Sequence, residues 1–214
     1  GCWIALLYGP VPGSENEPRP VLQNEKWGYI DHNGTMVITP QFDDAANFCD
    51  GLARVKQDGK YGFIDPNGKM VISPAYQKVD SFHDKLARFS QDGKFGYIDK
   101  AGATVIQPQF TDAGEFSEGL APATKGAKWG YIDRDGSWAS QPQFDDAFGY
   151  SDGLARVKVG GELGGKIGFV DRSGKMKINP KFSKCGDFKN GLAPCEVDGK
   201  WGFINKSGDF AVEP

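Results

Sequence analysis

Apolar and polar positions follow one pattern along most of the chain, in which short apolar runs alternate with glycine-containing polar turns. The turn Asp65-Pro66-Asn67-Gly68 separates the apolar runs 61–64 and 70–72. Aspartate bonds the following backbone, proline presets φ and glycine accepts positive φ, so this turn is typical of a hairpin. A third run, 52–55, leads into the next stretch through a second turn at 57–60. The pattern predicts three short strands per stretch and an all-β fold.

The same stretch occurs six times. It first reads KWGYID at residues 26–31 and begins again near 60, 94, 128, 166 and 200. The aromatic position advances by 34 residues at each step except one of 38, where four residues are added within 159–165. Such a fixed period indicates tandem structural repeats.

The segment that links the second and third strands has a different period. In 40–48 the apolar residues Phe42, Ala45 and Phe48 are spaced by three. Strands place every second residue on one face, so this spacing does not fit a strand. We expect a turn or a short helical hook, which returns the chain.

Comparison of the copies separates the faces of the strands. In the first strand Trp27 and Tyr29 point one way and Gly28 and Ile30 the other, so both faces are expected to be buried. We expect Gly28 to leave room for an aromatic ring of the hook. In the middle strand one position meets solvent because it tolerates Lys177, and the positions on either side are mostly apolar.

Two further substitutions carry predictions about packing. Trp138 is large where the nearby Ser140 is small, as volume compensation in one packed layer would produce. The last strand holds proline at Pro122 and Pro194, where the first copy has Arg54. Proline donates no backbone hydrogen bond, so this strand is expected to be an edge there.

These motifs resemble those of the WG-repeat family of bacterial proteins, named for its Trp-Gly pair. The resemblance covers about residues 18–214, with local departures such as Ile167 in place of the aromatic and Asn205 in place of Asp. It implies an all-β array, no established catalytic residues, and frequent occurrence in envelope or exported proteins. It implies no particular ligand.

A strand that is apolar on both faces must be covered on both, so neighbouring units must stack. We expect a closed, propeller-like ring of about six three-stranded units, and the alternative is an open superhelical β-array. The predicted organisation is a non-repeat N-terminal segment, 1–25, followed by a WG-repeat β domain, 26–214. By register, 18–26 matches a last strand and the chain stops after a middle strand. The two ends are therefore expected to complete one unit together.

Composition narrows the function. The chain has 214 residues, of which 30 are glycine, and a net charge of −3 with the signs interspersed. Nucleic-acid binding requires a clustered basic face, so it is not expected. No apolar run approaches the roughly 20 residues of a transmembrane helix.

The N-terminal segment does not follow the repeat. Its apolar stretch 3–8 and four prolines are compatible with an extra strand or a plug on the array. A second reading takes Gly1-Cys2 as the end of a lipoprotein signal, with Cys2 as the lipidated residue.

Candidate chemistry is sparse. Four scattered cysteines and two histidines make a zinc site improbable, no nucleophile or phosphate-binding motif occurs, and no metal or cofactor is expected. Cys185 and Cys195 are interpreted as small buried residues, with a disulfide between them as the alternative. The carboxylate pairs Asp43-Asp44 and Asp145-Asp146 would be catalytic only if different units converged. An enzyme with a site on a ring axis is therefore the weakest hypothesis.

The leading hypothesis is a non-catalytic scaffold that binds another protein, exported or located at the cell envelope rather than in the cytoplasm. Repeat arrays present variable loops on a rigid frame. The candidate partner-binding residues are Trp138, Glu162, Leu163, Asp43, Asp44, Asp145 and Asp146. The alternative is a module that binds glycan or cell-wall polymer, which would need exposed aromatic rings.

Overall fold

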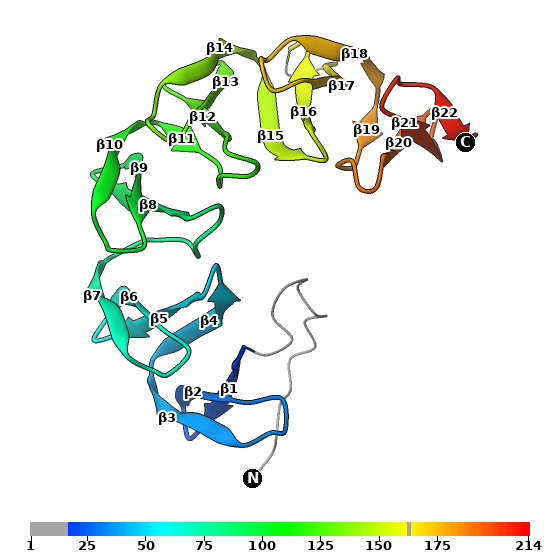
Figure 1. The fold of residues 1–214 in the computed structure, drawn as a ribbon. Coiled ribbons are helices and arrows are strands. Elements are labelled where there is room, and N and C mark those ends of the chain that lie inside the picture. The colour runs from blue at the N-terminus through cyan, green and yellow to red at the C-terminus, as the bar shows by residue number, and fades with distance from the viewer. Residues whose placement is uncertain (1–16, 162–163) are drawn as a thin grey trace. The chain divides into compact units, whose positions relative to one another are not determined.

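The structure, a computed structural model, describes residues 17–161 and 164–214. These residues form strands and turns without helix, and the strands make six small antiparallel sheets of three or four strands (Figure 1). The chain divides into two compact units, residues 1–108 and 109–214. The boundary falls within one strand, β10.

The first unit holds three sheets. Their strand orders are β1-β2-β3, β4-β5-β6-β7 and β10-β9-β8. The strands are β1 (Arg19–Gln23), β2 (Lys26–Ile30), β3 (Met36–Phe42), β4 (Asp44–Cys49), β5 (Leu52–Gln57), β6 (Lys60–Ile64), β7 (Met70–Tyr76), β8 (Leu86–Gln91), β9 (Lys94–Asp99) and β10 (Thr104–Phe110).

The second unit holds three four-stranded sheets, each in chain order. The strands are β11 (Asp112–Ala113), β12 (Ala121–Thr124), β13 (Trp129–Ile132), β14 (Trp138–Phe144), β15 (Asp146–Ser151), β16 (Leu154–Val159), β17 (Lys166–Val170), β18 (Met176–Phe182), β19 (Lys184–Cys185), β20 (Leu192–Val197), β21 (Lys200–Asn205) and β22 (Phe210–Val212).

The segment expected to be a turn or a helical hook forms an additional, outer strand of six residues in two of the sheets, as β4 and β15. β4 pairs with β5, with Ala45 opposite Val55 and Phe48 opposite Ala53. Three steps along β4 therefore match two steps along β5, which is a β-bulge. The bulge explains the apolar spacing of three, because it returns Ala45 and Phe48 to one face. The prediction of a non-strand hook was wrong for β4 and for its counterpart β15.

Sheet boundaries fall inside the sequence copies, between Phe42 and Asp44 in the first of them. Each four-stranded sheet therefore takes its first two strands from one copy and its last two strands, the Trp-Gly hairpin, from the next. The strand β1 pairs with β2, whereas β21 and β22 lie in one sheet with β19 and β20. The expectation that both ends complete one unit is therefore wrong for these strands.

The glycine of each Trp-Gly pair lies where two backbones meet. A Cβ atom on Gly28 would lie 2.4 Å from the carbonyl oxygen of Ile38 and 2.7 Å from the nitrogen of Pro40. Between Trp27 and Tyr29 the strand β3 carries extra residues, since their partners are Phe42 and Ile38. The glycine thus makes room for the bulged backbone of β3, not for an aromatic ring as expected.

The prolines of the last predicted strand do not mark an edge in the order of the sheets. Pro122 lies in β12, between β11 and β13, and Pro194 lies in β20, between β19 and β21. The outer neighbours β11 and β19 have only two residues each. Beside them Gly114 and Gly186 donate their N–H groups to the two proline carbonyls, at 2.8 Å each. Both proline-containing strands are therefore covered on this side, by outer strands of two residues.

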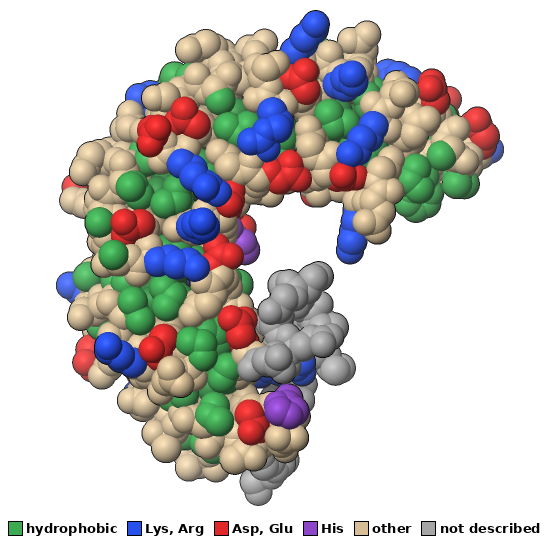
Figure 2. All heavy atoms as spheres, viewed as in Figure 1, with side chains coloured by type: hydrophobic (Ala, Val, Ile, Leu, Met, Phe, Trp, Pro, Cys, Tyr) green, Lys and Arg blue, Asp and Glu red, His purple; other side chains and the backbone are tan. Residues whose placement is uncertain are grey.

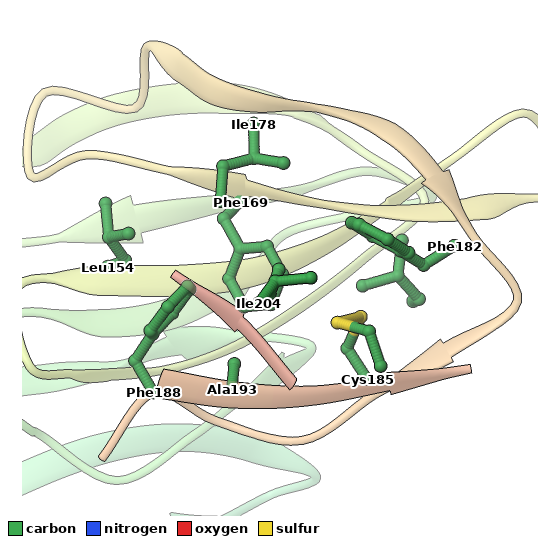
Figure 3. Packing of buried hydrophobic residues seen from close by; sticks show 10 residues of the cluster. Leu154, Phe169, Ile178, Phe182, Cys185, Phe188, Ala193 and Ile204 are labelled. Atoms are coloured by element: carbon green, nitrogen blue, oxygen red, sulfur yellow. A yellow bond between two sulfur atoms is a disulfide. The ribbon is translucent and has the colours of Figure 1, made fainter. Parts of the chain in front are cut away.

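Sheets pack through aromatic residues of the outer strand and its flanks. Figure 3 shows Phe188, which follows β19, lying against Phe169 of β17, with their ring centroids 4.8 Å apart. Equivalent pairs are Tyr29–Phe48, Phe63–Phe82 and Tyr131–Tyr150. The prediction that Tyr29 is buried is confirmed, but Trp27 is only half-buried.

Cys185 and Cys195 form a disulfide between β19 and β20, so the alternative interpretation of these residues holds. They face one another directly, with 4.1 Å between their Cα atoms. The same pairing position holds Ala113 and Ala123 in the first sheet of the second unit. The bond thus replaces a small apolar pair in the core beside Phe182 (Figure 3).

Candidate binding surface

The acids Asp43 and Asp145 occupy the same position in their copies and have the same structural role. The Nζ atom of Lys26 lies 2.6 Å from an oxygen of Asp43, and Lys128 pairs with Asp145 in the same way. Asp145 also accepts hydrogen bonds from the backbone of Gly160 and Gly161, at 2.8 Å each. Asp43 and Asp145 directly precede the outer strands β4 and β15, and their lysine partners lie at the start of the Trp-Gly hairpin of the preceding sheet. Both carboxylates therefore fix the start of an outer strand to that hairpin.

These contacts also set the charge state of the acids. The hydrogen bond from Lys128, followed by those from Gly161 and Gly160, lowers the pKa of Asp145 to about 2. The hydrogen bond from Lys26 lowers the pKa of Asp43 in the same direction. Each carboxylate is thus ionised at neutral pH and already bound to a cation, which is unlike a general acid.

The neighbouring acids Asp44 and Asp146 turn back onto their own strands. Each accepts a hydrogen bond from the next backbone N–H, that of Ala45 or Ala147. The hydroxyl of Tyr61 also donates to Asp44, at 3.2 Å. The two carboxylates of each pair therefore have different hydrogen-bond partners.

A second set of acids connects successive sheets. Asp152, in the turn between β15 and β16, accepts a hydrogen bond from the backbone of Gly191 at 2.6 Å and pairs with Lys206 at 2.8 Å. Both partners belong to the next sheet. Two acids at the same position in other sheets make the matching contact to the backbone of the sheet that follows. Asp50 accepts a hydrogen bond from the N–H of Lys85, and Glu118 accepts one from the N–H of Gly153.

Trp138 is half-buried rather than freely exposed. Its ring packs edge-to-face on Phe110, with centroids 5.8 Å apart. The small Ser140 lets the next turn come close, because a Cβ on Gly174 would lie 2.4 Å from the Ser140 Cβ. The space left by serine is therefore taken by that turn, and not by the indole as volume compensation predicted.

Three candidate residues cannot be placed. Glu162 and Leu163 of the insertion, and Cys2, the proposed lipidation site, lie outside the described residues. Where the chain is described, no group of three or more His, Cys, Asp or Glu side chains could hold a metal ion.

Apart from Leu22, the large apolar side chains that are exposed among the described residues fall into two sets that the sequence did not single out. The first, which we name the valine row, comprises Val37, Val71 and Val105, exposed to 46%, 41% and 47%. They hold one position in β3, β7 and β10. The prediction that this position meets solvent is confirmed, and the repeated valine was the available signal for an apolar row.

The second group lies on the last sheet, where Figure 2 shows hydrophobic side chains gathered beside β20 to β22. We name this group the Trp201 face. It comprises Leu192, Trp201, Phe203 and Val212, exposed to 38%, 52%, 44% and 54%. The repeat alone could not reveal it, because the same positions are buried or half-buried in the other complete copies.

With this geometry established, comparison with known proteins identifies the repeat. The model of the WG containing repeat matches residues 27–61, 61–95, 95–129, 129–162, 167–201 and 201–214. The chain belongs to the WG-repeat family. No curated protein matches this WG-repeat chain in sequence.

Solved structures similar to the WG-repeat chain are β-propeller proteins. BamB from Moraxella catarrhalis matches at a TM-score of 0.51 and 15% identity, over 90% of this chain and 68% of the BamB chain. A structure described as the eukaryotic initiation factor matches at 0.60 and 12% identity, over 92% of this chain and 63% of the other. The chain thus spans less than two thirds of that factor. At these identities the likeness concerns the fold, and the predicted all-β, propeller-like repeat is confirmed.

A search for membrane-crossing helices among residues 17–161 and 164–214 finds no helix of sufficient length and apolarity.

Proposed function

We propose that this WG-repeat chain is a non-catalytic scaffold that binds another protein. The observation that carries the proposal is the valine row, because it places an exposed apolar side chain at one position of three successive sheets. Single exposed valines are ordinary on protein surfaces, whereas a repeated apolar position is typical of the binding surfaces of repeat arrays.

The partner is expected to contact side chains rather than extend the sheets. The valines lie on β3, β7 and β10, which are edge strands. Each of these strands contains a proline, namely Pro40, Pro74 and Pro108. Proline in an edge strand removes a hydrogen-bond donor and blocks strand addition. Binding would therefore depend on burial of the valines.

The contacts of the candidate acids support a non-catalytic function. Asp43 and Asp145 are each held by a lysine, and Asp44 and Asp146 cap their own strands. A catalytic carboxylate must be available to substrate and suitably protonated, and these groups serve the sheet instead.

Export to an oxidising compartment is part of the proposal. The bond between Cys185 and Cys195 supports it, because disulfides persist in secreted and periplasmic proteins and are rare in the cytosol. Alkylation of thiols immediately on lysis of the source cells, followed by mass spectrometry, should find this pair protected. A fully alkylated pair would contradict export.

The test of the scaffold uses affinity capture from fractionated source cells. A variant with Val37→Ser, Val71→Ser and Val105→Ser should lose the bound protein, while its melting temperature stays close to that of the parent. The matched control is Ala139→Ser with Ala211→Ser, which changes the same exposed position in the second unit. If the triple variant captures the same protein as the parent, the valine row is not the binding surface.

Glycan binding remains a second candidate because of one exposed ring. Stacking on a sugar requires an accessible aromatic face, and Trp201 is the exposed member of the described tryptophans. Titration of the chain with cell-wall polysaccharides should then quench tryptophan fluorescence in the parent and not in Trp201→Phe. Unchanged fluorescence throughout would dismiss this candidate.

A further inference from the structure

The hairpin of the fifth sheet, formed by β17 and β18, carries a concentration of positive charge. Residues 166–184 include six Lys or Arg side chains and one Asp, in a chain whose net charge is −3. Figure 2 shows Lys and Arg side chains over these two strands. The valine row lies entirely in the first unit, so the proposed function does not yet account for this charge.

Three of the cations form a line along the edge strand β18. Lys175, Lys177 and Lys181 are exposed, and so is Asn179, whereas the residues between them are buried or half-buried. We name the three lysines the lysine row. Two residues of a strand span about 7 Å, so Lys177 lies about 7 Å from Lys175 along the strand and about twice that distance from Lys181.

Comparison of the copies shows that the sheet does not need these lysines. The position of Lys177 holds valine in the three sheets of the first unit and alanine in the fourth and sixth copies. The position of Lys181 holds no charged side chain in the other copies that contain it, and that of Lys175 holds lysine in one other copy. The corresponding residues of the fourth copy are Ser137, Ala139 and Gln143.

The charge of the lysine row is not neutralised within the described part of the chain. No ion pair there includes any of the three lysines, although Arg172 and Lys184 nearby are paired with Glu118 and Glu196. The Nζ atom of Lys181 donates to the carbonyl oxygen of Gly208 at 3.1 Å. This bond positions the ammonium group but leaves its charge available to an anion.

We propose that the lysine row binds an extended acidic segment of the partner protein, with Asp or Glu at every second residue. This inference rests on the proposed binding function and adds the chemistry of the segment that contacts the second unit. Alternate side chains of an extended segment are also about 7 Å apart, so its carboxylates match the spacing of the row. The amide of Asn179 can donate to the carboxylate between two lysines.

The segment contacts side chains and does not extend the sheet. Pro180 lies in β18 and removes a backbone donor from this edge, as proline does in β3, β7 and β10. Lysine offers mobile point charges rather than a planar fork, which suits carboxylates on an extended chain.

Other polyanions match the row less well. Single-stranded nucleic acid stacks its bases on aromatic rings beside the cations, and an interfacial membrane segment buries apolar side chains. None of the large apolar side chains that are exposed in the described part of the chain belongs to β15–β18. The surface around the row is therefore polar, as an acidic peptide requires.

The test is a fluorescence anisotropy titration of the full-length chain with labelled peptides. The probe repeats Glu-Thr five times, and its control has the same composition with all Glu residues grouped at one end. The alternating peptide should bind severalfold more tightly at low salt, because its carboxylates match the row. Raising the salt to about 0.15 M should weaken this binding severalfold, since exposed charges are then screened.

A variant that takes its residues from the fourth copy locates the site. Lys175→Ser, Lys177→Ala and Lys181→Gln together should weaken binding of the alternating peptide about tenfold, because each exposed ion pair contributes little alone. The fold should be kept, since the edge strand of the fourth sheet carries these side chains. Near-ultraviolet circular dichroism verifies it.

The matched control removes the same charge elsewhere. Lys60→Gln, Lys69→Gln and Lys94→Gln change three exposed lysines of the first unit and should alter the affinity less than twofold. The valine-row variant should also bind the peptide as the parent does. Failure of the peptide experiment is thus separate from failure of capture through the valine row.

Each other outcome overturns the proposal. Absence of binding would leave the row without an acidic ligand, and equal binding of the two peptides would show attraction without matched spacing. Equal losses in the two lysine variants would indicate an effect of net charge. Sedimentation with phosphatidylglycerol vesicles that the row variant abolishes, under conditions where the peptide does not bind, would identify a membrane surface as the occupant.

Discussion

Gly130, the glycine of the Trp-Gly motif in the fourth copy, shows why the motif admits no side chain. A Cβ atom there would lie 2.4 Å from the carbonyl oxygen of Ser140 and 2.8 Å from the nitrogen of Pro142. Both are backbone atoms of the adjacent bulged strand, so neither can move without breaking the register. The glycine is thus fixed by a close approach of two strands, and not by an unusual φ.

Substitution of Gly130 by alanine should therefore destabilise the chain by about 1–3 kcal/mol or more, as other overpacked sites do. The measurement is the urea unfolding curve followed by tryptophan fluorescence. Gly126→Ala is the matched control, because a Cβ there meets no atom within 4 Å. Equal stability of both variants would show that the bulge tolerates a side chain.

For these single residues the sequence predicted that a glycine is needed, but not which neighbouring atoms exclude a side chain. It showed that Gly28 needs free space, and it could not show that the neighbour is the backbone of Ile38 and Pro40 rather than a ring. A repeat period records which positions are equivalent, whereas the partner of a position depends on strand register. The same limit applies to Asp145, whose partners Gly160 and Gly161 lie in the irregular insertion.

The outer segment is the element that differs most among the sheets. It is a six-residue strand in β4 and β15, two residues in β11 and β19, and an isolated bridge between Val79 and Phe89 in the third sheet. The bulge in β4 produced an apolar spacing that imitates a helical turn, and this is why its strand was missed. The hairpins that contain the Trp-Gly motif have no such ambiguity and were predicted correctly.

In the last sheet the disulfide reinforces the shortest kind of outer strand. Replacing Cys185 and Cys195 together by alanine should keep the fold, because Ala113 and Ala123 form the same pair in another sheet. The bond closes a loop with a sequence separation of 10 residues, and its loss should cost about 2–3 kcal/mol through the entropy of the unfolded chain.

Unfolding curves with and without reductant provide the measurement for the disulfide. The parent should lose stability on reduction, and the double alanine variant should be insensitive to it. An unfolded double variant would contradict the prediction, since the fold would then depend on the covalent bond.

Over the whole molecule, each sheet is expected to be stabilised by its contacts with the neighbouring sheets. Phe188 is fully buried between the fifth and sixth sheets and lies against Phe169. Its replacement by alanine should cost about 3–5 kcal/mol, as for other buried aromatic residues. Hydrogen exchange should then rise in β15–β22 and remain unchanged in β1–β7.

The matched control for Phe188→Ala is Phe203→Ala, which removes the same ring from an exposed position of the same region. It should change stability by less than about 1 kcal/mol, since an exposed ring gives up little burial. Faster exchange throughout the chain in the Phe188 variant would indicate a single cooperative unit instead of coupled neighbours.

The offset between sequence copy and sheet has a consequence for how such a chain can change length in evolution. Each copy ends one sheet and begins the next, so excision of residues 61–94 would join Lys60 to Phe95 inside a single strand, with Lys60 in the place of Lys94. The resulting sheet would combine β4 and β5 with the hairpin β9–β10. Unequal recombination between any two copies should thus yield whole sheets, wherever the crossover falls.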